Sequence, residues 1–516
     1  MKKTGDFVRI NGHKYILGDR LGGGLEGNVF KIASVEGLTR DFSDHVIKIV
    51  DDSKMNPFER EKVLKHLKRL KSFRDDKDCQ LRSHIILPAY LLDDELGYIM
   101  KYASQHESLT KYIEFPVENF DEWYHQYGFK KRIQIIVDMF EALKDIHHEG
   151  LIFADLSPSN IMVDKKRNSI VFIDSDNMRD KYDNYSNVLG TPGYMAPEKL
   201  RPVTHSVSGN KYEKDGRISV DSDIFSAAVI AFELLTLQHP FVGDKIDDGT
   251  ADEFEAAKNC ETDYIFKEGT DNYSTHGLTH FYNQLVTKEI QKLFYRTFVD
   301  GKDNPALRPT DIEFCEAFHK ASNLIIKCSK CGFEQIAVDG NDKCCDCDKP
   351  FGSRLIFEIY NTFGQMDMAE AINNMGEFVD LDVDINNILI DGQKPCEKIR
   401  INRVVFDIGF MAEMLKTDPS FTIKKYLYLF DFENTSERSA PYAKIELKDL
   451  DGNIEIAVDP KYFPNAQLLN LTTKQYLPLN NGKAFKSDKY GVVFDRKPFG
   501  KGTLIISGKF VREWKR

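Results

Sequence analysis

Acidic and amide side chains at short spacing mark one segment of the sequence as a candidate reaction centre. The stretch LIFADLSPSNIMVD contains Asp155 and Asn160, and apolar residues flank it on both sides. An aspartate can accept a proton from a reacting hydroxyl group, and an amide oxygen can ligate a hard divalent cation. The segment is therefore a candidate loop for a general base and a metal ligand.

Two stretches nearer the N-terminus are suited to binding phosphate. In YILGDRLGGGLEGNVFKI, Gly22, Gly24 and Gly27 follow a G-x-G-x-x-G spacing, and Val29 comes shortly after them. Glycines let the backbone approach phosphate oxygens closely, and a valine can pack on a flat purine. Lys48 lies in the apolar stretch DHVIKIV, where a buried lysine needs an anionic partner. The alternative is an edge-strand lysine that reaches outward to solvent.

Two helices are expected to position these residues. The stretch PFEREKVLKHLKRLKSF has apolar residues at helical spacing, and we expect its Glu61 to pair with Lys48, with Glu59 as the alternative. Apolar residues also recur at helical spacing from Lys130 to Gly150, which predicts a helix that ends just before the Asp155 loop.

The order and spacing of these motifs resemble those of eukaryotic-like Ser/Thr protein kinases of the bacterial type. Further along, VFIDSDNM places Asp174 where kinases carry the aspartate of D-F-G, and GTPGYMAPE places Thr191 in the segment that seats the peptide substrate. The stretch NPALRPT offers Arg308 as an ion-pair partner for Glu198. The resemblance covers residues from about 14 to 324, and it implies a small β-rich lobe and a larger helical lobe with ATP between them.

The resemblance also implies a role for each matching residue. Lys48 would hold the α and β phosphates of ATP, and Glu61 would orient it. Asp155 would be the catalytic base, while Asn160 and Asp174 would bind Mg²⁺ or Mn²⁺. The remaining contacts to the nucleotide would come from the glycine-rich stretch and from the strand and hinge in YIMKYA, that is, from Gly22, Gly24, Gly27, Val29, Met100, Lys101, Tyr102 and Ala103.

Four residues depart from the family pattern, the first being Phe153 in place of the histidine of H-R-D. Ala154 removes an arginine that commonly clamps a phosphorylated activation loop, and Ser157 removes a lysine that approaches the transferred phosphate. Asp176 replaces the glycine of D-F-G, and we expect it to touch magnesium or order its water shell, with a turn cap at Asn177 as the alternative. The loop is then either an active variant of the D-L-S-P-x-N type, which we favour, or part of a pseudokinase scaffold that only binds nucleotide.

Cysteine spacing predicts a second site with a different chemistry. Cys328 and Cys331 form one C-x-x-C pair, Cys344 and Cys347 form another, and twelve residues separate the pairs. Four thiolates in two such pairs suit a structural, tetrahedral Zn²⁺ site, with a β hairpin in the insert between them. The adjacent Cys345 could compete for the second pair. This segment resembles a zinc ribbon.

The last third of the chain has a different pattern. In KIELKDLDGNIEIAV and the segments around it, apolar and polar residues alternate on either side of turn signals. This pattern predicts antiparallel β hairpins in a small sandwich or barrel used for binding or targeting. Residues 366–375 could add one helix. We therefore predict an α+β chain with a kinase-like domain at 1–324, a zinc ribbon at 325–352 and a β-rich domain at 353–516.

Composition limits the remaining function classes. The chain has 516 residues, which favours two or three domains, and its net charge of −11 argues against general nucleic-acid binding. Neither an export signal nor a transmembrane run is recognisable, so a cytoplasmic location is expected. The expected partners are a protein substrate and a regulatory protein on the β-rich tail. A nucleic-acid-binding unit regulated by the kinase is the weakest alternative, because the ribbon has few basic and aromatic residues.

Overall fold

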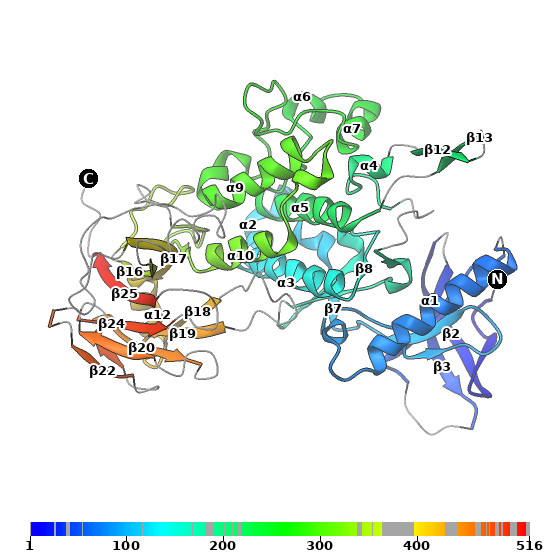
Figure 1. Cartoon of the computed structure of the whole chain (residues 1–516), viewed down its shortest axis with the longest axis horizontal. Coiled ribbons are helices and arrows are strands. Elements are labelled where there is room, and N and C mark those ends of the chain that lie inside the picture. Colours follow the sequence, from blue (N-terminus) through cyan, green and yellow to red (C-terminus); the bar gives the residue numbers. More distant parts are fainter. Residues whose placement is uncertain are drawn as a thin grey trace.

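Four structural units follow one another along the chain. The computed structural model describes residues 2–24, 27–37, 42–53, 55–115, 117–167, 169–181, 190–200, 203–207, 210–214, 218–337, 343–352, 354–363, 397–428, 441–459, 466–470, 472–473, 475–479, 484–486, 489–495 and 503–511. Figure 1 shows a β-rich N-terminal lobe, a central helical lobe and a β-rich C-terminal region, in that order along the longest axis. A small cysteine-rich unit follows the helical lobe in sequence.

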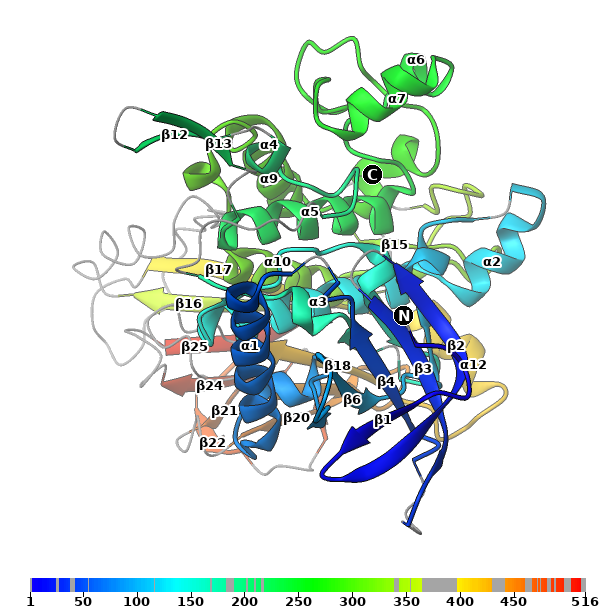
Figure 2. The ribbon, with the colours of Figure 1, turned by 90° about the vertical axis from the view of Figure 1, so that its right-hand side faces the viewer.

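The N-terminal lobe is built on one antiparallel sheet of six strands in the order β1-β2-β3-β4-β6-β5. Its buried apolar side chains alternate along the strands, as expected for a sheet with one face on a core. Helix α1 (Pro57–Asp75) runs beside this sheet, as Figure 2 shows, and begins at a capping box between Asn56 and Glu59. The strands are β1 (Phe7–Ile10), β2 (His13–Gly24), β3 (Gly27–Val35), β4 (His45–Val50), β5 (Tyr90–Leu91) and β6 (Gly97–Lys101).

Two long helices form the centre of the helical lobe. Helix α3 (Phe129–His148) has a broad buried face and leads directly into the Asp155 loop. Helix α5 (Val220–Thr236) is apolar on nearly all sides and buried along its length, and a capping box between Ser219 and Ser222 fixes its start. The other helices of this lobe are α2 (Phe120–Gln126), α4 (Pro197–Leu200), α6 (Asp244–Asp247), α7 (Ala251–Lys258), α8 (Tyr282–Leu285), α9 (Lys288–Tyr295) and α10 (Asp311–Ser322).

Short strands carry the loops of the helical lobe. Strands β9 and β10 lie on either side of the turn between the Asp155 loop and Asp174, and β7 pairs with β9. These short strands are β7 (His106–Ser108), β8 (Leu151–Ile152), β9 (Ile161–Asp164), β10 (Ile170–Phe172), β11 (Arg179–Asp180), β12 (Val203–Val207) and β13 (Asn210–Lys214).

The cysteine-rich unit packs directly on the helical lobe. Its strands β14 (Ile325–Lys327) and β15 (Glu334–Ile336) pair with each other, and the Phe333 ring stacks on Tyr124 of α2 at 5.0 Å. The Glu334 carboxylate accepts a hydrogen bond from the Lys130 backbone N–H at 2.7 Å, and this caps the first turn of α3. The apolar core therefore runs without a break from the helical lobe into this unit.

The C-terminal region consists of two antiparallel sheets that share one apolar core. One sheet has the strand order β17-β16-β25-β24-β21-β22, and the other has the order β18-β19-β20-β23. The elements are β16 (Arg354–Phe363), β17 (Glu397–Asp407), α12 (Ile408–Leu415), β18 (Ile423–Tyr428), β19 (Pro441–Leu447), β20 (Asn453–Val458), β21 (Gln467–Asn470), β22 (Tyr476–Pro478), β23 (Phe485–Lys486), β24 (Tyr490–Asp495) and β25 (Thr503–Val511).

Most predicted elements lie where the sequence pattern places them. The helices expected before the Asp155 loop and after Lys48 are α3 and α1, and the hairpin about Asp451 and Gly452 joins β19 to β20. The helix proposed for residues 366–375 falls outside the described residues. Among the residues that are described, no helix is both long and apolar enough to cross a bilayer.

Candidate active site

Lys48 is buried on β4 and has two carboxylate partners. Its ammonium contacts Oδ1 of Asp176 at 2.8 Å and Oδ1 of Asp174 at 3.2 Å. Burial by itself favours the neutral amine, but the two carboxylates outweigh it, and the pKa of Lys48 is raised. The alternative of an outward-reaching edge lysine is therefore wrong, because Lys48 points inward and β4 lies between β3 and β6.

The expected pairing of Lys48 with helix α1 is wrong. Glu61 is exposed, and Glu59 uses its carboxylate to accept the backbone N–H of Asn56 at 2.9 Å. Neither glutamate contacts Lys48 in the structure, because the face of α1 that carries them turns to solvent. Asp176 supplies the carboxylate partner of Lys48 that the sequence predicts on α1.

Asp176, which we expect to touch magnesium or order its water shell, is held by donors of the protein itself. Its Oδ1 accepts hydrogen bonds from Lys48 and, at 2.9 Å, from the Tyr98 hydroxyl. Only 8% of its side chain is exposed, compared with 34% for Asp174. Burial opposes ionisation of Asp176, but the Lys48 charge and these hydrogen bonds lower its pKa. Of the two carboxylates, Asp174 is thus the more accessible to a metal ion.

Asp174 begins the turn that contains both carboxylates. Its backbone adopts a left-handed conformation, with φ 58° and ψ 43°, which aspartate tolerates better than most residues. Burial raises the pKa of Asp174. The positive charge of Lys48 opposes this rise, and the negative charge of Asp176 adds to it. The preceding residue, Ile173, donates its N–H to the Asn160 carbonyl at 3.0 Å, so the turn is joined to the Asp155 loop.

The Asp155 loop holds the Asp155 carboxylate next to a hydroxyl group. Oδ1 of Asp155 accepts a hydrogen bond from the Thr191 hydroxyl at 3.0 Å. The Asn160 amide nitrogen donates to the Asp155 carbonyl at 2.8 Å and to Oδ2 at 3.2 Å. Both contacts of Asn160 use its nitrogen, so the amide oxygen is the atom suited to a metal ion. The loop thus combines an oriented carboxylate with an amide whose oxygen is not used in these two contacts.

Ser157 is fully buried in this loop and does not supply a charge. Its hydroxyl lies 2.8 Å from the hydroxyl of Ser159. A lysine that sequence reasoning missed lies beside the loop: the Lys199 ammonium, from α4, donates to the Ala154 carbonyl. Burial lowers the pKa of Lys199. The only signal in the sequence is its position directly after A-P-E.

The glycine-rich stretch forms the turn end of the β2–β3 hairpin. Gly22 pairs with Val29 and Gly24 with Gly27, while residues 25 and 26 between them lie outside the described part. At Gly27 a Cβ atom would lie 2.2 Å from the Ile49 carbonyl oxygen. This close approach of two strands admits only glycine.

The segment after β6 has the position of a hinge between the lobes. Met100 is buried near the end of β6. The Tyr102 N–H already donates to the Asp44 carbonyl at 2.7 Å, so the expectation that this amide binds a nucleotide is wrong. The Lys101 carbonyl and the Ala103 N–H remain the candidate backbone groups.

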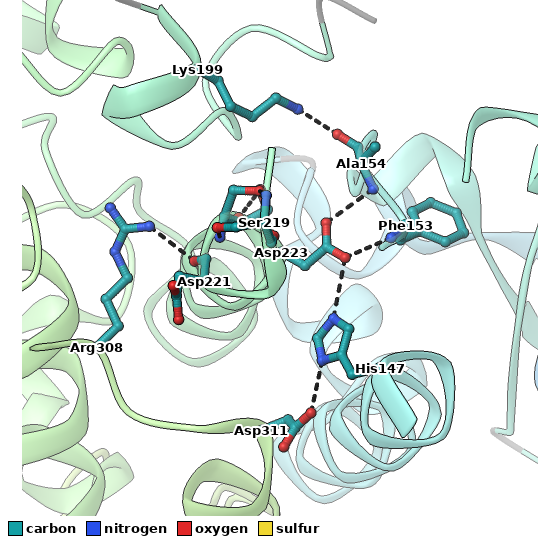
Figure 3. A network of polar contacts seen from close by, with 11 residues as sticks. His147, Phe153, Ala154, Lys199, Ser219, Asp221, Asp223, Arg308 and Asp311 are labelled. Carbon is teal, nitrogen blue, oxygen red and sulfur yellow. Dashed lines mark hydrogen bonds and ion pairs between the residues drawn. The ribbon is translucent and has the colours of Figure 1, made fainter. Parts of the chain in front are cut away.

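A buried polar network holds the Asp155 loop from below (Figure 3). The Asp223 carboxylate, at the start of α5, accepts the backbone N–H groups of Phe153 at 2.6 Å and Ala154 at 3.0 Å. His147, from the end of α3, lies between Asp223 at 3.2 Å and Asp311 at 2.8 Å. Burial opposes protonation of this imidazole, but the two carboxylates raise the pKa of His147 to about 9.

The predicted ion pair between Arg308 and Glu198 is confirmed. The Nη1 and Nη2 atoms of Arg308 donate to the two carboxylate oxygens of Glu198 at 2.7 and 2.8 Å. The Arg308 side chain is completely buried, and its guanidinium also lies over the Phe225 ring. This bidentate pair fixes α4 against the helical lobe.

The four predicted cysteines come together in the cysteine-rich unit. The sulfur atoms of Cys328, Cys331, Cys344 and Cys347 all lie within 4.8 Å of one another. The pairs Cys328–Cys347 and Cys331–Cys344 are each 3.6 Å apart, close to the ~3.8 Å between thiolates bound to one tetrahedral zinc ion. The donor set therefore fits zinc.

Two details of the cysteine-rich unit differ from or refine the sequence prediction. Cys345 stays outside the sulfur cluster, and its backbone N–H donates to Gln335 Oε1 at 2.9 Å. The hairpin was expected between the two pairs, but β15 pairs backward with β14 across the first pair. Residues 338–342 of the insert lie outside the described part.

Comparison with known proteins agrees with this geometry. Residues 15–298 match the family model of the protein kinase domain, which is more than half of the chain. The serine/threonine-protein kinase PknB of Mycolicibacterium smegmatis is 31% identical over 121 residues, 22% of this chain and 17% of that protein. The serine/threonine-protein kinase pkn3 of Myxococcus xanthus is 30% identical over 123 residues, 22% of this chain and 20% of that protein.

A longer match extends beyond the kinase region. Calcium-dependent protein kinase 5 of Plasmodium falciparum is 28% identical over 410 residues, 77% of this chain and 61% of that protein. The chain thus spans less than two thirds of the length of these relatives.

Proposed function

Because the chain belongs to the protein kinase family, we propose that it transfers the γ-phosphate of ATP to Ser or Thr hydroxyl groups of a protein substrate. One observation carries the proposal: the four groups that the reaction needs are joined in one chain of contacts. Lys48 contacts Asp174, the turn at Asp174 is bonded to Asn160, and Asn160 bonds Asp155. This continuity supports a working site.

Each of these residues has a defined task in the proposed reaction. Asp155 accepts the proton of the substrate hydroxyl through the carboxylate that now accepts a hydrogen bond from the Thr191 hydroxyl. Lys48 positions the α and β phosphates, and Asn160 and Asp174 hold the metal ions. Bound Mg²⁺ would neutralise charge on the phosphates. The glycine-rich hairpin and the hinge around Met100 enclose the nucleotide.

The competing proposal is a pseudokinase scaffold that binds nucleotide without transfer. It is favoured by Ser157, because the loop lacks the family's lysine beside the transferred phosphate. An active enzyme is the better proposal, since the base, the lysine and both metal ligands are all present in compatible positions.

The Asp155→Asn variant distinguishes the two proposals. It keeps the size of the side chain and its contacts with Thr191 and Asn160 but loses the proton acceptor. We expect MgATP affinity to change little and transfer to a general acceptor protein to fall by about 10²–10⁴-fold. Wild-type protein that binds MgATP but transfers phosphate to no acceptor, itself included, would establish the scaffold.

The rest of the chain has a supporting role in this proposal. The three domains would be bounded at 324/325 and 352/353, and the middle one would hold one structural Zn²⁺ on Cys328, Cys331, Cys344 and Cys347. The sulfur spacing supports this assignment. The two C-terminal sheets, which share one core, would form a sandwich that binds a regulatory protein.

A further inference from the structure

The main charge partner of Lys48 lies at a position where the family pattern does not predict one. Asp176 occupies the glycine position of D-F-G and lies closer to Lys48 than Asp174 does, at 2.8 against 3.2 Å. The same oxygen, Oδ1, also accepts the Tyr98 hydroxyl at 2.9 Å. Tyr98 and Lys48 are paired neighbours on β6 and β4, so the sheet itself directs both donors at one oxygen.

Helix α1 has no carboxylate that could compete for this role. Its three acidic residues are Glu59, Glu61 and Asp75, and all three are exposed. Glu59 is committed to the helix cap, and Asp75 pairs with Lys71 on its own helix. Lys48 therefore depends on the turn at Asp174 for its charge partners.

One side chain of α1 near Asp176, that of His66, carries no charge. His66 of this helix is mostly buried close to Asp176, and burial, with the charge of Arg179, lowers its pKa to about 4. A second contact ties α1 to the segment after the turn, because Arg69 pairs with Asp180 of β11. Helix α1 thus packs against the turn without supplying a charge to Lys48.

Burial separates the tasks of the two carboxylates. Asp176 is 8% exposed, and its Oδ1 accepts hydrogen bonds from both Lys48 and Tyr98, so its charge is compensated inside the protein. Asp174 is 34% exposed and makes the longer contact to Lys48. Asp174 can turn to a metal ion while Asp176 continues to hold the lysine.

We propose that Asp176 is the positioning residue for Lys48 and takes the place of a carboxylate on α1. This inference rests on the proposed function, because the lysine that Asp176 holds is the one assigned to the phosphates. A single turn then carries both functions: Asp176 holds Lys48 in place, and Asp174 ligates the metal ion. A shift of α1 would not disconnect Lys48 from its partner, so helix movement would not switch the site off.

Three single variants of the full chain test the proposal. Asp176→Asn removes the charge while keeping the size and an oxygen acceptor. Tyr98→Phe removes one of the two hydrogen bonds to Asp176. Glu61→Gln is the matched control, since it removes the α1 carboxylate that the family pattern would assign to Lys48. Binding of MgADP is measured by titration calorimetry, and phosphate transfer from MgATP to a general acceptor protein is measured separately.

We expect Asp176→Asn to weaken MgADP binding and to lower kcat, together reducing kcat/KM by about 100-fold, because a displaced lysine no longer meets the phosphates. Tyr98→Phe should act in the same direction by about 3- to 10-fold, as expected for one hydrogen bond. Glu61→Gln should stay within about 2-fold of wild type, as an exposed residue without a partner role should. If a substitution only destabilised the fold, it would lower the melting temperature and the fraction of molecules that bind MgADP, but not the affinity of the molecules that remain folded.

Two results would overturn the proposal: wild-type affinity and kcat in Asp176→Asn, or a loss in Glu61→Gln as large as in Asp176→Asn. If Asp176→Asn does not fold, Tyr98→Phe decides, and wild-type MgADP affinity there counts against the role. MgADP binding does not require transfer. A chain without transfer activity whose MgADP affinity falls in Asp176→Asn but not in Glu61→Gln would refute the proposed function and support the role of Asp176.

Discussion

The charge on His147 should make the helical lobe more stable at neutral than at alkaline pH. The imidazole lies between Asp223 and Asp311, and its pKa rises from 6.5 to about 9 in the folded protein. Below pH 6.5 both the folded and the unfolded protein carry the proton, so the stabilisation is fully present there. It is lost as the pH rises through the folded-state pKa, because the folded protein then gives up the proton.

The size of this effect follows from the shift in pKa. At about 1.36 kcal/mol per pKa unit, the rise to about 9 corresponds to roughly 3 kcal/mol. The His147→Gln variant keeps a polar side chain but cannot carry the charge. The difference in unfolding free energy between wild type and variant should therefore shrink by roughly 3 kcal/mol between pH 6 and pH 9.5.

Urea unfolding followed by tryptophan fluorescence measures this difference. The sequence has two tryptophans, Trp123 and Trp514, so a Trp514→Phe background leaves Trp123 of α2 as the single reporter of the helical lobe. His13→Gln, at an exposed histidine, controls for the loss of any imidazole. Parallel stability curves for wild type and His147→Gln across this pH range would refute the reasoning.

Two further predictions concern the contacts that hold the kinase lobe and the cysteine-rich unit. Arg308→Met should lower the unfolding free energy by about 3–5 kcal/mol in urea titrations, because it leaves Glu198 without its partner; a loss below about 1 kcal/mol would mean that solvent compensates the carboxylate. Protein purified without chelators should contain one zinc ion per chain by elemental analysis. Cys331→Ser should lose this metal, whereas Cys345→Ser, outside the cluster, should keep it; equal zinc content in the two variants would contradict the ligand assignment.

The sequence predicts some parts of this site better than others for physical reasons. Strong helical spacing locates α3 and α1, and the Glu198–Arg308 pair follows from motif order. The partner of Lys48 cannot be predicted from motif order or spacing, because the spacing of residues along a helix does not determine which face of the helix meets the sheet. Glu61 lies on the solvent side of α1, and the carboxylates that contact Lys48 come from the turn at Asp174 instead.

The contacts around the Asp155 loop show the same limit. Lys199 reaches the Ala154 carbonyl only after the chain has folded back, and no local pattern marks that contact. The strand β15 pairs backward across the first cysteine pair, since hydrogen-bond register depends on the whole unit. Local periodicity therefore predicts elements, whereas long-range packing decides their partners.

The Glu334 cap on helix α3 determines how the kinase lobe can be isolated as a fragment. A chain cut after residue 324 would lose the acceptor for the Lys130 N–H and would uncover the Tyr124 ring that Phe333 covers. The first turn of α3 would then fray, at the end of the helix opposite to the Asp155 loop. A fragment that continues through residue 352 keeps both contacts, and limited proteolysis of the intact protein should leave this longer piece.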